Sequence, residues 1–127
     1  MTVNCLFCQI DPSKQLSSND LAIAIADTFP VSPGHCLIIP KRHFSSLFEA
    51  AEEERASLWQ LLDQTREHLM KHQCPDGLNI GINDGIAAGQ TIIHLDIHLI
   101  PRYAGDTVDP RGGIRWVMPD KAPYWKE

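Results

Sequence analysis

The sequence predicts an α+β domain with an antiparallel sheet. Four short apolar runs lie on either side of one long helical pattern at 45–72. These runs span residues 21–26, 35–40, 78–82 and 91–100. Strand–strand–helix–strand–strand order with short connections favours antiparallel pairing. The 127 residues are 43% hydrophobic and 21% charged, enough apolar material for one core, so we treat 1–127 as a single domain.

The first half of the chain alternates turns with short strands. Residues 11–20 (DPSKQLSSND) are expected to be a turn-rich connector. The strand at 21–26 is followed by a connection at 29–34 that holds two prolines and a glycine. The run 35–40 (HCLIIP) then reads as a short buried strand, and its histidine, His35, is interpreted as structural rather than catalytic.

Helical spacing is clearest between 45 and 72. One apolar stripe is formed by Leu58, Leu61, Leu62, Thr65 and Leu69. Acidic residues at 52–54 suit the positive end of the helix dipole, and Pro75 and Gly77 end the pattern. His68 and His72 are four residues apart, a spacing that can bind metal, but without a third ligand they are interpreted as helix-surface histidines.

The stretch GQTIIHLDIHLIPR, from Gly89 to Arg102, is the most informative. Its run 91–100 is apolar or β-branched apart from three polar residues, and successive side chains on a strand point to opposite faces. The first set, expected on one polar face, is His94, Asp96 and His98. The second set, expected in the core, is Thr91, Ile93, Leu95, Ile97 and Leu99. Pro101 is expected to close the strand.

Composition excludes several classes of function. The net charge of −5 argues against non-specific binding to nucleic acid. The first residues, MTVNCLFCQIDPSK, lack the basic start and apolar core of a signal peptide, and no apolar run is long enough to span a membrane. We therefore expect a cytoplasmic protein whose four cysteines are thiols or metal ligands rather than disulfides.

The motif Cys5-Leu-Phe-Cys8 has the spacing of half a zinc site or of a redox pair. The alternative of a redox pair expects a preceding strand, and only four residues precede Cys5. In the remaining alternative, the two cysteines are buried thiols beside Phe7 and Ile10. Zinc would need two further ligands that lie near in space but not in sequence.

Two stretches resemble the histidine triad (HIT) family. Its signature is His-φ-His-φ-His-φ-φ after a Gly-Gln-Thr/Ser turn, and the match covers Gly89-Gln90-Thr91, His94, His98 and every apolar position. The central histidine is replaced by Asp96. The run SPGHCLIIPKRH is a second close match. The resemblance spans about 4–103 and implies a five-stranded antiparallel sheet, one long and one short helix, and a two-fold dimer that extends the sheet.

The resemblance also implies a site. The implied catalytic residues are Asp96, His98, His94 and Gln90. The implied nucleotide-binding residues are Phe7, Ile10, Asp27, Asn83, Gly89, Gln90, Thr91 and His98. A structural zinc would be held by Cys5, Cys8, His43 and His94. The implied ligand is a purine nucleotide or dinucleoside polyphosphate, cleaved or transferred at its α-phosphate, with no organic cofactor.

Asp96 leaves the reaction open. In the family the central histidine is the nucleophile, and a carboxylate adds negative charge beside the phosphate. Asp96 could form an acyl phosphate or orient a water, the protein could bind nucleotides without turnover, or the aspartate could be an engineered or allelic change. A metal site using two of the three polar residues, or a partner-binding surface, are alternatives from other classes. Asp27 could equally cap a turn instead of binding ribose.

The tail at 104–127 has no period. We expect it to wrap over the body or over a partner subunit, with Trp116, Tyr124 and Trp125 docking it or stacking on a base. Arg102, Arg111 and Arg115 could meet a phosphate or a carboxylate.

Overall fold

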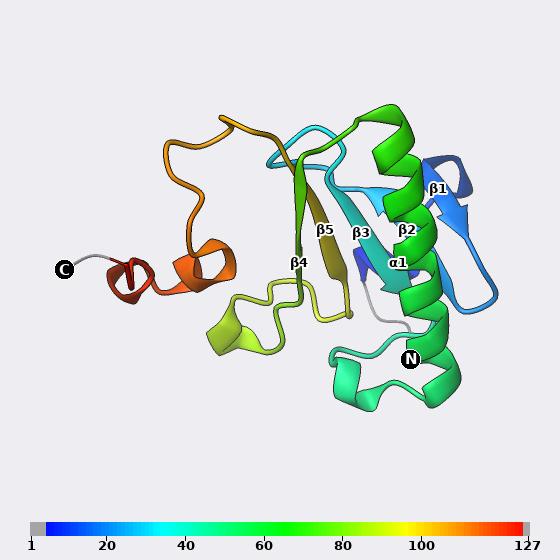
Figure 1. The fold of residues 1–127 in the computed structure, drawn as a ribbon. Coiled ribbons are helices and arrows are strands. Elements are labelled where there is room, and N and C mark those ends of the chain that lie inside the picture. The colour runs from blue at the N-terminus through cyan, green and yellow to red at the C-terminus, as the bar shows by residue number, and fades with distance from the viewer. Residues whose placement is uncertain (1–4, 126–127) are drawn as a thin grey trace.

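The computed structural model describes residues 5–125, which form a five-stranded antiparallel sheet with one long helix packed against it (Figure 1). The strand order is β1-β2-β3-β5-β4. The strands are β1 Gln15–Ser18, β2 Ala22–Ala26, β3 Cys36–Pro40, β4 Gly77–Gly81 and β5 Ile97–Arg102, and the helix is α1 Glu52–His72. The predicted α+β class and its five-stranded antiparallel sheet with one long helix are confirmed.

The main core lies between the sheet and α1. The predicted stripe on the helix is buried throughout, with Leu58 and Leu61 fully enclosed, and it packs on Ala24, Ile38 and Ile97. Burying side chains of this size contributes about 1.5–3 kcal/mol each. None of the helices in the described part of the chain has the length and apolar character needed to cross a membrane.

A second, smaller apolar cluster lies on the other face of the sheet. Ile23, Leu37 and Ile39 point there, because alternate strand residues face opposite ways. Phe7 and Ile10 from the N-terminal segment pack against them. The register Leu37↔His98 places the His98 side chain on this same face, away from α1.

The strand predicted at 91–100 begins only at Ile97, and that prediction is therefore wrong for its first half. Residues 92–94 form bends, and Thr91 and Ile93 are exposed rather than in the core. The reason is Pro40. The β3–β5 register would bring it opposite Leu95, where it has no N–H to donate.

Other boundaries differ more modestly. The helical pattern predicted from residue 45 contains a separate 3-10 turn, Leu47–Glu49, before α1. The predicted connector 11–20 contains the exposed edge strand β1, which its polar sequence did not indicate. Pro101 lies inside β5 rather than at its end, because β3 pairs only with 97–99 and leaves β5 with one neighbour there.

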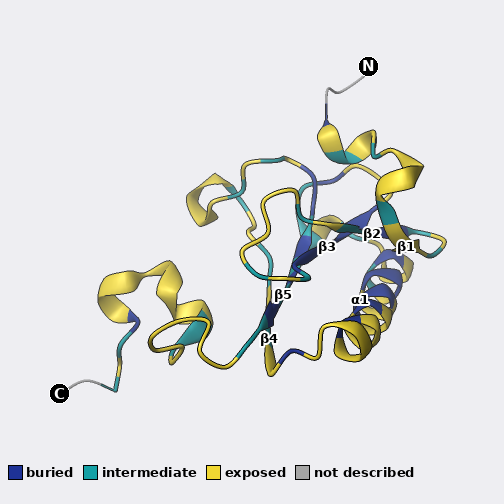
Figure 2. Ribbon diagram, turned by 90° about the horizontal axis from the view of Figure 1, so that it is seen from above, coloured by how far each residue is buried: buried dark blue, intermediate teal, exposed yellow. Residues whose placement is uncertain are grey.

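The tail extends past β4, on the side of the sheet away from α1 (Figure 1). Figure 2 shows that it is mostly exposed. Its 3-10 turn Gly113–Val117 contacts β4. Of the three arginines expected to meet a phosphate or a carboxylate, two meet carboxylates: Arg102 binds Asp106 and Arg111 binds Asp109. Arg115 instead donates to the carbonyls of Lys121 and Ala122.

Candidate functional site

A cavity of about 520 Å³ opens on the sheet face that α1 does not cover, and we call it the sheet cavity. It is lined by most of the residues predicted to bind or act on a nucleotide, namely Phe7, Asp27, Asn83, Gly89, Gln90, Thr91, Asp96 and His98. Ile10 lies behind its wall in the small apolar cluster. Further lining residues that the sequence did not indicate are Leu6, Ile25, Thr28, Phe29, Leu37 and Ile92.

His35 directs the ring of His98. The backbone N–H of Val31 donates to His35 Nδ1 at 3.1 Å, so the His35 proton is on Nε2. That Nε2 lies 2.9 Å from His98 Nδ1 and donates to it. His98 therefore carries its own proton on Nε2, which faces Asp96 Oδ1 at 3.5 Å. Burial lowers the pKa of His35, which favours this neutral form.

The predicted structural role of His35 therefore includes orienting His98. This contact joins residues 63 positions apart, and only the pairing of β3 with β5 brings them together. A histidine at the start of a buried strand, on the same face as Leu37, is the only sequence signal for it.

Asp96 is a half-buried carboxylate at the edge of the sheet cavity. Burial raises its pKa, the negative charge of Asp27 raises it further, and His98 acts in the opposite direction. A carboxylate with a raised pKa is a stronger proton acceptor than one on the surface. Asp96 is thus better suited to accept a proton at neutral pH than an ordinary aspartate.

Asp27 caps a turn, which is one of the two roles that the sequence left open, and it also lines the sheet cavity. Its Oδ1 accepts the N–H of Phe29 at 2.8 Å, which caps the turn after β2. Its Oδ2 lies 3.4 Å from His35 Nε2 and 3.9 Å from His98 Nδ1. Asp27 therefore supports the histidine pair while it lines the sheet cavity.

Gln90 braces the loop that precedes Asp96. Its Oε1 accepts the N–H of Gly85 at 2.9 Å, and its Nε2 donates to the carbonyl of Ser45 at 3.0 Å. Gly85 and Gly89 both have a φ of 95°, a backbone conformation that favours glycine. Gln90 also lines the sheet cavity.

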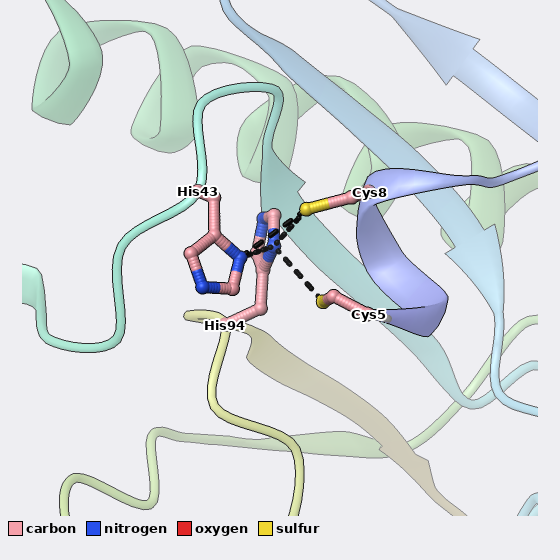
Figure 3. A group of neighbouring side chains, drawn as sticks. All are labelled: Cys5, Cys8, His43 and His94. Atoms are coloured by element: carbon pink, nitrogen blue, oxygen red, sulfur yellow. Dashed lines mark hydrogen bonds between the residues drawn. The ribbon is translucent and has the colours of Figure 1, made fainter. Parts of the chain in front are cut away.

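Cys5, Cys8, His43 and His94 form a second group, which we call the Cys/His cluster (Figure 3). Cys8 Sγ lies 3.2 Å from His43 Nδ1, and His43 Nδ1 lies 3.2 Å from His94 Nδ1. Both sulfur atoms lie 3.6 Å from His94 Nδ1. Ligand atoms around a tetrahedral zinc lie roughly 3.3–3.8 Å apart, so these distances fit one such ion.

His94 lies in this cluster and does not share a face with Asp96 and His98. The prediction that the three residues share one face is therefore wrong. Residues 92–94 precede the strand, so strand alternation does not apply to them. The fully buried ring has its Nε2 2.8 Å from the carbonyl of Pro40, and this carbonyl fixes the proton on Nε2. Nδ1 is left unprotonated, as a metal ligand must be, and burial lowers the pKa of the ring.

The side chains of Asp27, His35 and His98 also lie close enough together to hold a metal ion. The positions of their protons argue against metal binding there. The His35 atom that faces the group is Nε2, and the hydrogen bond from Val31 places a proton there. An N–H cannot ligate a metal ion. The donor set therefore fits a hydrogen-bonded chain, whereas the Cys/His cluster fits zinc.

His68 and His72 lie on the exposed surface of α1, as predicted. Their rings stack with centroids 4.1 Å apart, and His72 Nδ1 lies 2.9 Å from the carbonyl of His68. Both border a second cavity of about 750 Å³ between α1 and β1. No metal cluster within residues 5–125 includes them.

Similarity to known proteins agrees with the fold. The chain is 37% identical over 107 residues to an adenylylsulfatase of Arabidopsis thaliana, and this match covers 81% of the chain but only 54% of that protein. It is 36% identical over 97 residues to a bis(5'-adenosyl)-triphosphatase of Dictyostelium discoideum, covering 76% of the chain and 65% of that protein.

Solved structures give the same result. A zinc-bound histidine triad family protein from Mycobacterium smegmatis superimposes with a TM-score of 0.75 at 32% identity, covering 84% of this chain and 80% of that one. A HIT family protein from Bacillus subtilis gives a TM-score of 0.76 at 31% identity, covering 82% and 77%. The model of the HIT domain matches residues 9–105. The chain belongs to the HIT domain family.

Proposed function

We propose that the sheet cavity binds a purine nucleotide or dinucleoside polyphosphate. Apolar side chains, among them Phe7, Ile25 and Leu37, provide a surface on which a base can pack. His98 Nε2–H and the loop at 89–92 offer donors to a phosphate, and Asp27 has carboxylate lone pairs for ribose hydroxyls. Relatives named for adenylylated substrates support a nucleotide over other ligands of this size.

The reaction we propose is hydrolysis at the α-phosphate. Asp96 accepts a proton from a water, the water oxygen bonds to phosphorus, and the bond from phosphorus to the leaving phosphate or sulfate oxygen breaks. His98 donates its Nε2 proton in a hydrogen bond to a phosphoryl oxygen. The observation that carries this assignment is the chain Val31–His35–His98, which aims a proton donor at the carboxylate side of the sheet cavity.

The test is release of AMP from diadenosine triphosphate by the natural protein, Asp96→Asn and Asp96→His. If Asp96 is the base, the natural protein turns over and Asp96→Asn loses roughly 100-fold or more. A 32P label on the α-phosphate that stays on acid-quenched protein would assign Asp96 as nucleophile instead. Asp63→Asn, an exposed change on α1, is the control for loss of one charge.

A second candidate function is nucleotide binding without turnover. The favouring observation is charge: Asp27 and Asp96 both border the sheet cavity, and its lining within residues 5–125 holds no Lys or Arg. A carboxylate beside a phosphate opposes attack on it. Binding of AMP by the natural protein with activity only in Asp96→His would establish this function. Absence of AMP binding in both would remove the nucleotide assignment altogether.

We further propose that the Cys/His cluster holds a structural zinc ion. Zinc would neutralise the two thiolates and tie three chain segments together. Metal analysis of purified protein should find close to one zinc per chain in the natural protein and much less in Cys8→Ser. Cys74→Ser, which changes an exposed cysteine outside the cluster, is the control and should keep the metal.

We also propose a two-fold dimer. β4 is an edge strand of the sheet, its Ile80 side chain is 44% exposed, and the neighbouring tail presents further apolar side chains such as Val117 and Met118. Unpaired edges and exposed apolar groups of this kind favour association. Light scattering after size-exclusion chromatography should give about twice the chain mass of 14.2 kDa.

A further inference from the structure

One short turn contributes to both the Cys/His cluster and the sheet cavity. Cys5 and Cys8 enter the cluster from the same turn (Figure 3). Leu6 and Phe7, the two residues between them, line the sheet cavity. The 3-10 turn Leu6–Cys8 and the residue before it thus form part of the wall of both sites.

Phe7 touches both sites directly. Its ring meets the ring of His94 edge-on, with centroids 5.9 Å apart and an interplanar angle of 86°. It also packs against the small apolar cluster that contains Leu37, and both Phe7 and Leu37 line the sheet cavity. A shift of the Phe7 ring therefore changes the surroundings of a cluster histidine and the surface offered to a ligand.

The turn has weak anchors of its own. Among the described residues, its backbone hydrogen bonds are local ones, from Cys8 N to Cys5 O at 3.2 Å and from Gln9 N to Leu6 O at 3.4 Å. Leu6 is 73% exposed. The side chains of Cys5, which is buried, and of Phe7 are therefore what holds the turn against the body, and a further interaction would hold it more firmly. Coordination of Cys5 and Cys8 is the interaction that the cluster offers.

A second part of the sheet cavity's lining is joined to the same cluster. His94 lies two residues before Asp96, in the irregular segment ahead of β5. This segment is fixed by Leu95 N donating to Phe44 O at 2.7 Å and by the His94 contact to Pro40. A metal held by His94 and the two cysteines would bridge the Phe7 wall to the chain that carries Asp96.

From this shared wall we infer that metal binding at the Cys/His cluster and nucleotide binding in the sheet cavity are positively coupled, with Phe7 as the positioning residue that transmits the coupling. The inference rests on the nucleotide and zinc sites proposed above. Coupling free energies are reciprocal, so zinc must strengthen AMP binding by the same factor by which AMP strengthens zinc binding. We expect a factor of about ten, inside the roughly 5–150-fold range found for coupled sites.

Titration calorimetry tests the coupling in both directions. AMP is titrated into zinc-loaded protein and into chelator-stripped protein, and zinc affinity is measured by chelator competition with and without saturating AMP. The inference predicts equal factors near ten. It is overturned if AMP binds both forms equally. Absence of AMP binding to either form overturns it together with the proposed nucleotide site, and absence of zinc binding overturns it together with the proposed metal site.

Variants of two phenylalanines distinguish an effect on the coupling from an effect on AMP binding itself. Phe7→Ala keeps all four cluster residues and should bring the factor close to one. Phe29→Ala is the matched control, because Phe29 also lines the sheet cavity but lies in the β2–β3 connection, outside the cluster. It should weaken AMP binding to both forms alike and leave the factor near ten. Equal factors in the two variants would overturn the role of Phe7.

Cobalt gives a readout that needs no metal-free protein. Co²⁺ bound by two thiolates and two imidazoles absorbs visible light, and its bands respond to small changes in ligand geometry. Saturating AMP should shift the bands of the cobalt-loaded natural protein and of Phe29→Ala, but shift those of Phe7→Ala much less. A spectrum that AMP leaves unchanged in the natural protein, under conditions where AMP is bound, would overturn the inference.

Discussion

His35 Nε2 lies 2.9 Å from His98 Nδ1, and the proton between them belongs to His35 because Val31 N–H occupies the other ring nitrogen. His98 is thereby held with its own proton on Nε2, on the Asp96 side. The position of this proton therefore depends on the β2–β3 connection, which supplies Val31, as well as on the strand that carries His98.

His35→Ala should release His98 from this tautomer, whereas His35→Gln can still donate an N–H to His98 Nδ1. We expect kcat for AMP release to fall by roughly 10–100-fold in the alanine variant, a loss of the size expected when a catalytic acid or base is poorly oriented. The glutamine variant should recover part of this loss. The 15N chemical shifts of His98 report its tautomer without any need for turnover. Unchanged shifts in His35→Ala would contradict the orienting role.

Asp96→Asn should stabilise the fold at neutral pH. Burial first, and Asp27 second, raise the pKa of Asp96 above its ordinary 3.8, so the folded chain holds this proton more tightly than the unfolded chain does. The ionised carboxylate therefore costs stability, and stability falls as pH rises through the raised pKa. We expect Asp96→Asn to melt roughly 2–5 °C higher at pH 7.

The same comparison below pH 3.8, where Asp96 is protonated in both states, should show no difference in melting temperature. Asp63→Asn on the exposed side of α1 is the matched control and should change little at either pH. A lower melting temperature for Asp96→Asn at pH 7 would mean that the carboxylate is stabilised by its neighbours.

Glu54→Gln should destabilise the start of α1. Glu54 is 6% exposed, accepts two hydrogen bonds from Arg42 at 2.8 and 2.9 Å, and accepts a third from the N–H of Ala51. Loss of the charged acceptor is expected to cost about 1–3 kcal/mol in urea unfolding. Glu53→Gln, an exposed neighbour in the same turn, should cost less than about 1 kcal/mol.

The Glu54 effect should depend on pH. The hydrogen bonds from Arg42 lower the pKa of Glu54, so its contribution is present above the ordinary value of 4.5 and is lost as pH falls through the lowered pKa. The natural protein and Glu54→Gln should therefore approach each other in stability in acid. A difference that persists in acid would point to packing rather than charge.

Cys74→Gly should stabilise the protein. Cys74 follows α1 with a φ of 50°, where its N–H donates to the carbonyl of Leu69 at 3.1 Å. A side chain in this left-handed conformation is strained, and glycine relieves the strain by about 1 kcal/mol. Cys74→Ala keeps the strain, so it should match the natural protein in thermal unfolding. Equal stability of the glycine and alanine variants would contradict the argument.

Local patterns in the sequence predicted which faces of α1 and β5 are buried. The stripe from Leu58 to Leu69 fixed the buried face of α1, and the alternation of Ile97, His98 and Leu99 fixed the two faces of β5. The family resemblance supplied the residues that meet at the sheet cavity and at the Cys/His cluster.

Contacts between distant segments were not predictable in this way. The role of His35 depends on the pairing of β3 with β5, and β1 is a strand only because β2 lies beside it. The alternation around His94 predicted a strand. The sequence there does not reveal that the residue opposite Leu95 on β3 would be a proline.

Pro40 thus has an effect that reaches beyond its own strand. Lys41 N bonds to Leu21 on the β2 side, so the next residue back, Pro40, faces β5 with a carbonyl and no N–H. The His94 ring takes that carbonyl. With no N–H at position 40, the ladder between β3 and β5 lacks the hydrogen bond that would continue it to Leu95. One strand residue thus ends a ladder with its nitrogen and, with its oxygen, orients the buried histidine of the Cys/His cluster.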